Sequence, residues 1–243
     1  MLDIKAKARE VYEQGFCVLD GVYRADECEE MRKVLDRVWE KRGHPPLTGF
    51  GIGIHPLLQH APEMAPFFAK GVVIDTIAEV FRDDVRLAHS GARISNEESI
   101  EFLGWHYHCG DWNLNTSEHR SKVERVLCNV YVDGLSDGVG PLLVYPRKVD
   151  DSLTPPYSET NSDWPGQVVV ACSLGSAVIF DVRVFHAAKR GKGPGLRHLW
   201  GGHYQGWNNL TPHREDNSAE GTEIEMYKKQ FPIFRKLVEP RKA

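Results

Sequence analysis

Cysteines are few in this sequence, and their arrangement excludes two classes of small protein. The chain has five, scattered along its length and never in a Cys-x-x-Cys pair: Cys17, Cys28, Cys109, Cys128 and Cys172. An odd number without paired spacing argues against both a disulfide framework and a zinc ribbon. We expect free, buried thiols, and single out only Cys109, because it adjoins two histidines.

Basic charge and long apolar runs are also missing. The formal net charge is -4, so no basic excess would attract nucleic acid or an anionic membrane surface. No apolar run approaches the roughly 18 to 20 residues that span a bilayer, and the opening MLDIKAKAREVYEQG lacks the apolar region of a signal peptide. We therefore predict a cytoplasmic protein with no nucleic-acid or membrane partner.

The distribution of apolar residues predicts a β core with helices outside it. The 243 residues suit one full core better than two, which predicts a single domain over 1–243. Helical spacing marks residues 4–12, 25–40 and 71–81, and the tail 223–243 is also amphipathic. Between 85 and 204 short runs of Val, Ile, Leu and aromatic residues alternate with turn residues. This pattern indicates a sandwich or barrel at about 85–205, with helices of 1–82 on its outside and a helical C-terminal tail.

Two histidines lie in the segment Gly104 to Trp112, which is the richest in reactive side chains. His106 and His108 are two residues apart, so on a strand they point to one face and suit cis coordination of a metal ion. Histidine pairs also occur without metal, inside a polar barrel mouth. This segment alone leaves both interpretations open.

A second segment, residues 174–200, supplies another histidine and an arginine. An apolar strand ends in His186, a basic glycine-rich connection follows, and a new strand begins at Arg197. An arginine at a strand start is commonly an exposed surface residue. Arg197 follows His186 by eleven positions (197 minus 186). This spacing becomes informative only when the two segments are considered together.

Together these segments resemble the phytanoyl-CoA dioxygenase family of iron(II)- and 2-oxoglutarate-dependent oxygenases. Trp105-His106 is similar to the opening of the family's His-x-Asp ligand motif, His186 to its distal histidine, and Arg197 stands at the spacing of the family's arginine. The runs Gly140 to Pro146 and Gly15 to Val22 resemble two family strands in the family's order. The likeness therefore extends over most of the chain.

The resemblance implies a double-stranded β-helix, of the jelly-roll or cupin-like type, that holds Fe(II) and binds 2-oxoglutarate. In such sites two histidines and one carboxylate hold the iron and leave three positions open for a bidentate 2-oxo acid and O2. Arg197 is expected to bind the far carboxylate of 2-oxoglutarate. Asn129 lies on a strand where the family often contacts the cosubstrate, and Arg93 can reach the same pocket from its own strand.

The sequence departs from the family at the carboxylate ligand, because His108 stands two residues after His106. His108 binds the metal, or Asp111 reaches in from a bulged strand, or iron is bound poorly or not at all. Strand geometry favours the first, since Asp111 has an odd offset from His106. We predict His106, His108 and His186 as ligands, in a site one charge more positive than the family's. Ala188 also stands where family members often carry a hydroxyl residue.

The predicted function is a non-haem iron oxygenase that uses O2 and 2-oxoglutarate to oxidise a small-molecule substrate. The alternatives are a three-histidine dioxygenase independent of 2-oxoglutarate, a non-catalytic binding protein of the same family, and a zinc hydrolase. We expect the loop histidines His55 and His60 to be bystanders. We expect a pocket with aromatic walls and with His203 and Arg183 near its mouth. The aromatic candidates are Trp105, Tyr107, Trp112, Tyr204 and Trp207.

Overall fold

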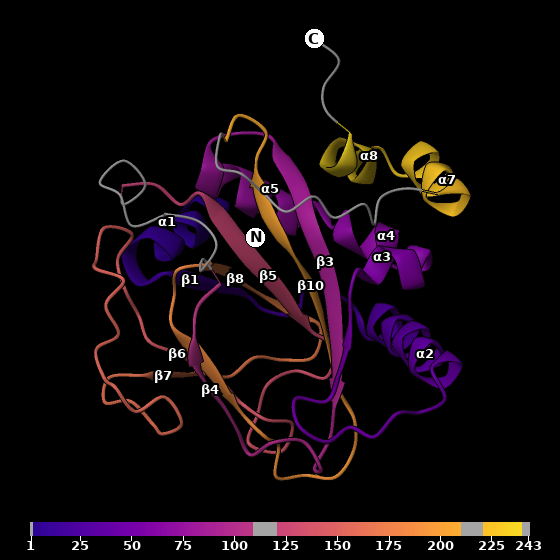
Figure 1. The fold of residues 1–243 in the computed structure, drawn as a ribbon. Coiled ribbons are helices and arrows are strands. Elements are labelled where there is room, and N and C mark those ends of the chain that lie inside the picture. The colour runs from indigo at the N-terminus through magenta and orange to yellow at the C-terminus, as the bar shows by residue number, and fades with distance from the viewer. Residues whose placement is uncertain (1, 109–120, 210–220, 240–243) are drawn as a thin grey trace.

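Two antiparallel sheets face each other, and helices cover the outer face of the larger one (Figure 1). The computed structural model describes residues 2–108, 121–209 and 221–239. The larger sheet has the strand order β1 (Phe16–Leu19), β8 (Ser176–Asp181), β5 (Arg125–Tyr131), β10 (Arg197–Gly206), β3 (Val85–Ser95), β2 (Ile52–Ile54). The smaller has the order β4 (Phe102–His106), β9 (His186–Lys189), β6 (Leu142–Val144), β7 (Val168–Val170). The predicted jelly-roll fold is confirmed.

Helices precede and follow this β core. They are α1 (Ile4–Gln14), α2 (Ala25–Lys41), α3 (Leu57–His60), the 3-10 helix η1 (Pro62–Met64), α4 (Ala65–Phe68), α5 (Gly71–Phe81), α7 (Thr222–Gln230) and α8 (Pro232–Val238). The Asp3 side chain accepts a hydrogen bond from the Ala6 amide at the start of α1, and Gly15 ends that helix with a φ of 87°. A side chain at Gly15 would also lie 2.2 Å from a Val184 methyl, so this position requires glycine.

Three details differ from the sequence predictions. The segment around His55 and His60, expected to be a loop, contains β2, α3 and η1. The first of the short runs expected from residue 85 is a long strand that continues to Ser95, because its second half pairs with β10. His186 begins a strand instead of ending one: the chain turns after Asp181, whose side chain accepts the Arg183 amide and whose carbonyl accepts the Val184 amide.

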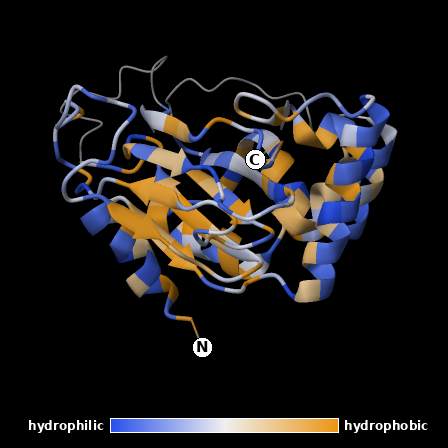
Figure 2. Ribbon diagram, turned by 90° about the horizontal axis from the view of Figure 1, so that it is seen from below, coloured by the Kyte–Doolittle hydropathy of each residue, from blue (hydrophilic) through white to orange (hydrophobic). Residues whose placement is uncertain are grey.

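Apolar side chains fill both layers between these elements. One cluster lies between the helices and the large sheet and includes Met31, Ile77 and Trp200. A second lies between the two sheets and includes Phe180 and Val144. Figure 2 shows the hydrophobic strands at the centre and hydrophilic residues on the outward sides of the helices. No helix among the described residues is long and apolar enough to cross a bilayer.

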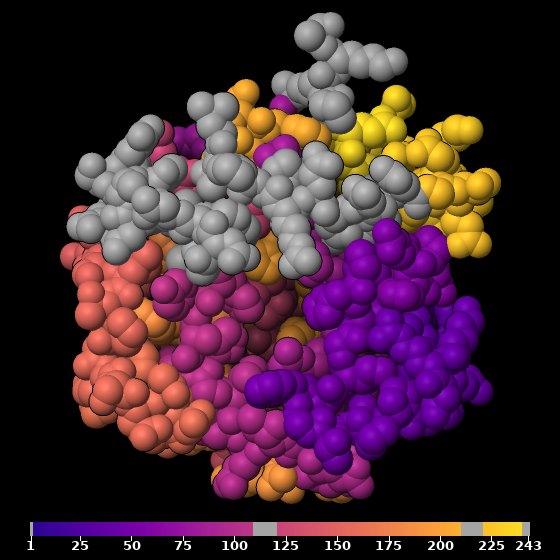
Figure 3. All heavy atoms as spheres, viewed as in Figure 1, coloured from indigo at the N-terminus to yellow at the C-terminus, as the bar shows by residue number. Residues whose placement is uncertain are grey.

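The space-filling view shows how the chain's segments divide the surface. N-terminal residues, indigo to purple, occupy one side of the face in Figure 3, and a salmon-coloured segment from the middle of the chain occupies the other. The face is hollowed between the purple residues and the magenta ones.

Candidate metal centre

Neighbouring strands of the smaller sheet bring the three predicted ligands together. β4 and β9 pair so that His106 and His186 lie directly opposite each other. His108 follows the end of β4, where its backbone amide donates a hydrogen bond of 2.8 Å to the Val182 carbonyl. One ring nitrogen from each histidine lies within 4.8 Å of the others. The sequence pattern therefore found a real spatial cluster.

Hydrogen bonds to backbone carbonyls set the protonation of two of these rings. His106 Nδ1 donates to the Gly104 carbonyl at 2.7 Å, and His186 Nδ1 donates to the Val184 carbonyl at 3.0 Å. Because a carbonyl only accepts, each Nδ1 carries the proton and each Nε2 keeps a lone pair for a metal. His108 Nε2 and His186 Nε2 are 3.2 Å apart. Two nitrogens at about 2.1 Å from one ion and at a right angle would lie about 3.0 Å apart, so the donor set fits a single divalent cation.

Burial favours the neutral form of the three imidazoles, which is the form that binds metal. It lowers the pKa of His106, and with help from His106 it lowers the pKa of His108 to about 4. Burial and the two neighbouring histidines lower the pKa of His186 well below its usual value. No carboxylate joins this cluster among the described residues. Asp111 and Cys109 lie outside those residues, so the alternative in which Asp111 completes the site lies there too.

The two predicted cosubstrate residues line the same cavity as the histidines. This cavity has a volume of about 340 Å³, and Arg197, Asn129 and Arg93 contribute to its wall. The guanidinium carbon of Arg197 lies 5.6 Å from the centre of the Tyr131 ring, and its Nε is buried without a hydrogen-bond partner among the described residues. A buried guanidinium without a partner is costly. A carboxylate held in this cavity would supply that partner.

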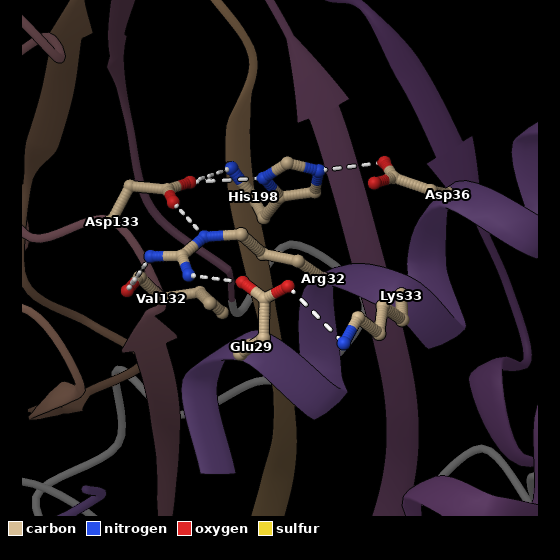
Figure 4. Close-up of polar contacts among 7 residues, drawn as sticks. All are labelled: Glu29, Arg32, Lys33, Asp36, Val132, Asp133 and His198. Atoms are coloured by element: carbon tan, nitrogen blue, oxygen red, sulfur yellow. Dashed lines mark hydrogen bonds and ion pairs between the residues drawn. The ribbon is translucent and has the colours of Figure 1, made fainter. Parts of the chain in front are cut away.

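Behind Arg197, a network of charged groups fixes the start of β10 against α2 (Figure 4). Successive strand residues face opposite sides, so His198 points away from the cavity. Its Nδ1 lies 3.0 Å from Asp133 Oδ2 and its Nε2 lies 2.9 Å from Asp36 Oδ1. Arg32 Nε also donates to Asp133 Oδ1, at 2.6 Å. Burial lowers the pKa of His198, but the two carboxylates outweigh it and that pKa is raised.

Three further histidines line the same cavity, and His55, which was expected to be a bystander, is one of them. His89 of β3 and His203 of β10 are paired in register. His55 Nδ1 lies 3.2 Å from His89 Nε2, and the ring centres of His203 and His108 are 5.5 Å apart. A side chain at Gly91 would lie 2.4 Å from the His55 ring, so glycine makes room for it. No local sequence signal marks this cluster, because it arises from the pairing of distant strands.

Aromatic residues line this cavity, but they are Tyr131 and Trp200 instead of the predicted ones. Of the aromatic candidates that the structure describes, none lines it. Trp105 stacks on Trp164 with ring centres 4.4 Å apart, and Tyr204 is buried under the helices. Trp112 lies outside the described residues. Arg183 was also misplaced by the prediction, since it is 1% exposed and forms an ion pair of 2.6 Å with Asp181.

Comparison with known proteins places this geometry in a family. The sequence pattern of the phytanoyl-CoA dioxygenase (PhyH) family matches residues 11–199. The chain belongs to the phytanoyl-CoA dioxygenase family. The predicted class, an iron(II)- and 2-oxoglutarate-dependent oxygenase, is thereby confirmed at the level of the family. Among curated proteins, none matches this PhyH chain in sequence.

Solved structures share the fold of this PhyH protein at low sequence identity. HygX from Streptomyces hygroscopicus, with nickel and 2-oxoglutarate bound, is 18% identical with a TM-score of 0.66, over 84% of this chain and 87% of that one. EctD from S. alaskensis, with 2-oxoglutarate and 5-hydroxyectoine, is 17% identical with a TM-score of 0.66, over 85% and 77%. SnoK, a non-heme alpha-ketoglutarate-dependent carbocyclase from nogalamycin biosynthesis, is 17% identical with a TM-score of 0.67, over 91% and 95%.

Proposed function

We propose that this PhyH protein is an iron(II)- and 2-oxoglutarate-dependent oxygenase whose metal is held by His106, His108 and His186 alone. The residues 1–243 act as one oxygenase domain in this proposal. Arg197 binds the far carboxylate of 2-oxoglutarate, and Asn129 contacts the same cosubstrate. The observation that carries the proposal is one cavity lined by three converging imidazoles and by Arg197, whose buried Nε has no hydrogen-bond partner among the described residues.

The residues around the metal position each have a defined task. The carbonyls of Gly104 and Val184 hold the rings of His106 and His186 with Nε2 toward the ion. Arg197 offers a planar, permanently charged fork that matches a carboxylate. Bound Fe(II) would supply the activation of O2 that couples decarboxylation of 2-oxoglutarate to oxidation of the substrate. HygX and EctD, which share this fold, both have structures with 2-oxoglutarate bound.

The substrate enters from the end of the cavity that His55, His89 and His203 line. His55 is exposed there, while His203 lies next to the ligand His108. A volume of about 340 Å³ is at the lower end for ligand cavities, and cosubstrate and substrate must share it. The substrate is therefore a small molecule, oxidised at the carbon that the cavity presents to the metal.

Anaerobic titration with Fe(II), followed by O2 and 2-oxoglutarate, tests the proposal. We expect one iron per chain and formation of succinate, the product of 2-oxoglutarate decarboxylation. His186→Ala should abolish both, because it removes a ligand, whereas His60→Ala, at an exposed histidine outside the cavity, should change neither. Protein that binds neither Fe(II) nor Co(II) would instead be a non-catalytic member of the family.

The Arg197→Ala variant separates the two enzymatic alternatives. If 2-oxoglutarate is the cosubstrate, removal of the guanidinium should raise its KM by about a hundredfold, since two charge-assisted hydrogen bonds are lost. A three-histidine dioxygenase that binds its substrate directly to iron would keep its turnover in this variant. If the Arg197→Ala variant oxidises the substrate at an unchanged rate in the absence of 2-oxoglutarate, the second mechanism is the correct one.

A further inference from the structure

A second cavity of about 320 Å³ adjoins the metal cavity beyond Arg197, and we call it the outer cavity. The two share five lining residues: Arg93, Ser95, Leu103, Ala188 and Arg197. The family's usual hydroxyl side chain is missing at Ala188, which leaves only a methyl group at this junction. The far end of the proposed cosubstrate site is therefore open to a second space.

The described lining of the outer cavity carries more positive charge than negative charge. Its described lining includes four basic residues and no Asp or Glu: Arg93, Lys189, Arg190 and Arg197. Lys189 is partly neutralised by an ion pair of 2.7 Å with Asp163. Arg190 donates from Nη1 to the Ser99 carbonyl at 3.1 Å and is otherwise exposed. The lining thus offers guanidinium groups to an anion.

Arg93 is a lining residue that lacks a polar partner among the described residues. It is half-buried, and no hydrogen bond or ion pair joins its guanidinium to another described residue; the group lies 5.8 Å from the centre of the Phe50 ring. Arg197 pairs with Ser95, and Leu199 with Arg93, so both arginines point to one face of the sheet. Burial, and then the charge of Arg197, lower the pKa of Arg93.

Two adjacent guanidiniums repel each other and need more negative charge than one carboxylate provides. The three-histidine cluster adds to this imbalance, because its ligands are all neutral. The far carboxylate of a bound 2-oxo acid would neutralise Arg197 and leave Arg93 and Arg190 facing the outer cavity. An oxyanion there would receive the planar donors of both groups.

We propose that the outer cavity is a second anion site, where Arg93 and Arg190 bind a carboxylate or phosphate group of a small polyanion. The inner ligand, at Arg197, rests on the proposed function, but the outer site does not require metal or turnover. The anion has two possible sources, a separate metabolite or a 2-oxo acid longer and more charged than 2-oxoglutarate. Both share the same chemistry at the two arginines.

Calorimetric titration of the metal-free full chain tests this site. Citrate and inorganic phosphate serve as separate probes at constant ionic strength, each with and without saturating 2-oxoglutarate. We expect saturable binding that Arg93→Gln and Arg190→Gln each weaken about tenfold or more, because each removes hydrogen bonds to a charged group. Lys192→Gln is the matched control: it lies in the same segment, 81% exposed and outside the lining, and should leave binding unchanged.

The outcomes separate the sources and can overturn the site. Binding of citrate that persists with 2-oxoglutarate assigns a separate polycarboxylate, and stronger binding of phosphate assigns a phosphorylated one. If 2-oxoglutarate abolishes citrate binding, and Arg190→Gln still weakens citrate binding when 2-oxoglutarate is absent, the ligand is a longer 2-oxo acid that spans both cavities. Binding that is absent, or that Arg190→Gln leaves unchanged, or that Lys192→Gln weakens equally, refutes the outer site while leaving the oxygenase proposal intact. Because Arg190 is exposed, its variant keeps the test valid even if Arg93→Gln folds poorly.

Discussion

Replacement of Arg197 by methionine should make the ligand-free protein more stable and remove its response to 2-oxoglutarate. The guanidinium of Arg197 makes no hydrogen bond to another described residue, and its Nε is buried. Methionine fills much of the space of the arginine stem without placing a charge in the cavity. The variant therefore loses an uncompensated buried group and keeps the packing around it.

The size of the effect follows from that unpaired donor. A buried polar group without a partner costs about 1–3 kcal/mol, so the free energy of unfolding should rise by about that amount. In a chain of this size each kcal/mol shifts Tm by about 2–4 °C. For the unmodified chain, 2-oxoglutarate at a hundredfold excess over its Kd should add about 2.7 kcal/mol, which the variant cannot gain.

Thermal unfolding with a constant level of Co(II), with and without 2-oxoglutarate, measures both effects. Arg37→Met is the control, because Arg37 forms a surface ion pair with Glu63 at 3.0 Å and is 51% exposed. That variant should shift stability by less than about 1 kcal/mol and respond normally to 2-oxoglutarate. A less stable Arg197→Met protein, or one that 2-oxoglutarate stabilises as much as the unmodified chain, would show that the guanidinium is not held for an acidic ligand.

Three further substitutions test other parts of the site. His108→Asp adds a negative ligand and should raise Fe(II) affinity about tenfold or more, by direct titration; equal affinity would mean that His108 does not contact the metal. The raised pKa of His198 stabilises the folded chain when the ring is protonated. This contribution is fully present below the pKa of about 6.5 that the residue has in the unfolded chain. It is lost as pH rises through the pKa of the folded state. The difference in urea unfolding free energy between the unmodified chain and His198→Gln should therefore shrink from pH 6 to pH 9, and a constant difference would contradict this. Gly91→Ala should displace the His55 ring, which NMR of the His55 ring signals detects; unchanged signals would contradict the close approach.

The cluster of three histidines could be predicted from the sequence because local spacing and the family resemblance pointed to the same residues. His106 and His108 stand two positions apart, and the resemblance to the family supplied His186 and Arg197. The helix at 71–81 was also predicted with its observed bounds, since apolar periodicity determines them locally.

Of the three histidines His55, His89 and His203, only His203 was expected near the pocket. The other two could not be predicted because their positions depend on long-range strand register. His89 and His203 meet only because β3 and β10 pair, with a bulge between His203 and Tyr204. The same pairing puts Tyr204 among the helices, which is why Tyr204 was wrongly expected to line the pocket. Arg183 was misplaced for a related reason, since nothing local shows that it would pair with Asp181.

The proposed ligands of the metal all belong to the smaller sheet and its edge, whereas Arg197 and Asn129 belong to the larger one. A 2-oxo acid bound as proposed would therefore span the interior and fasten one layer to the other. Part of its binding free energy would go into holding the layers at their proper spacing. Substitutions in the apolar contact between the sheets, far from any polar group that touches the cosubstrate, would then change its affinity.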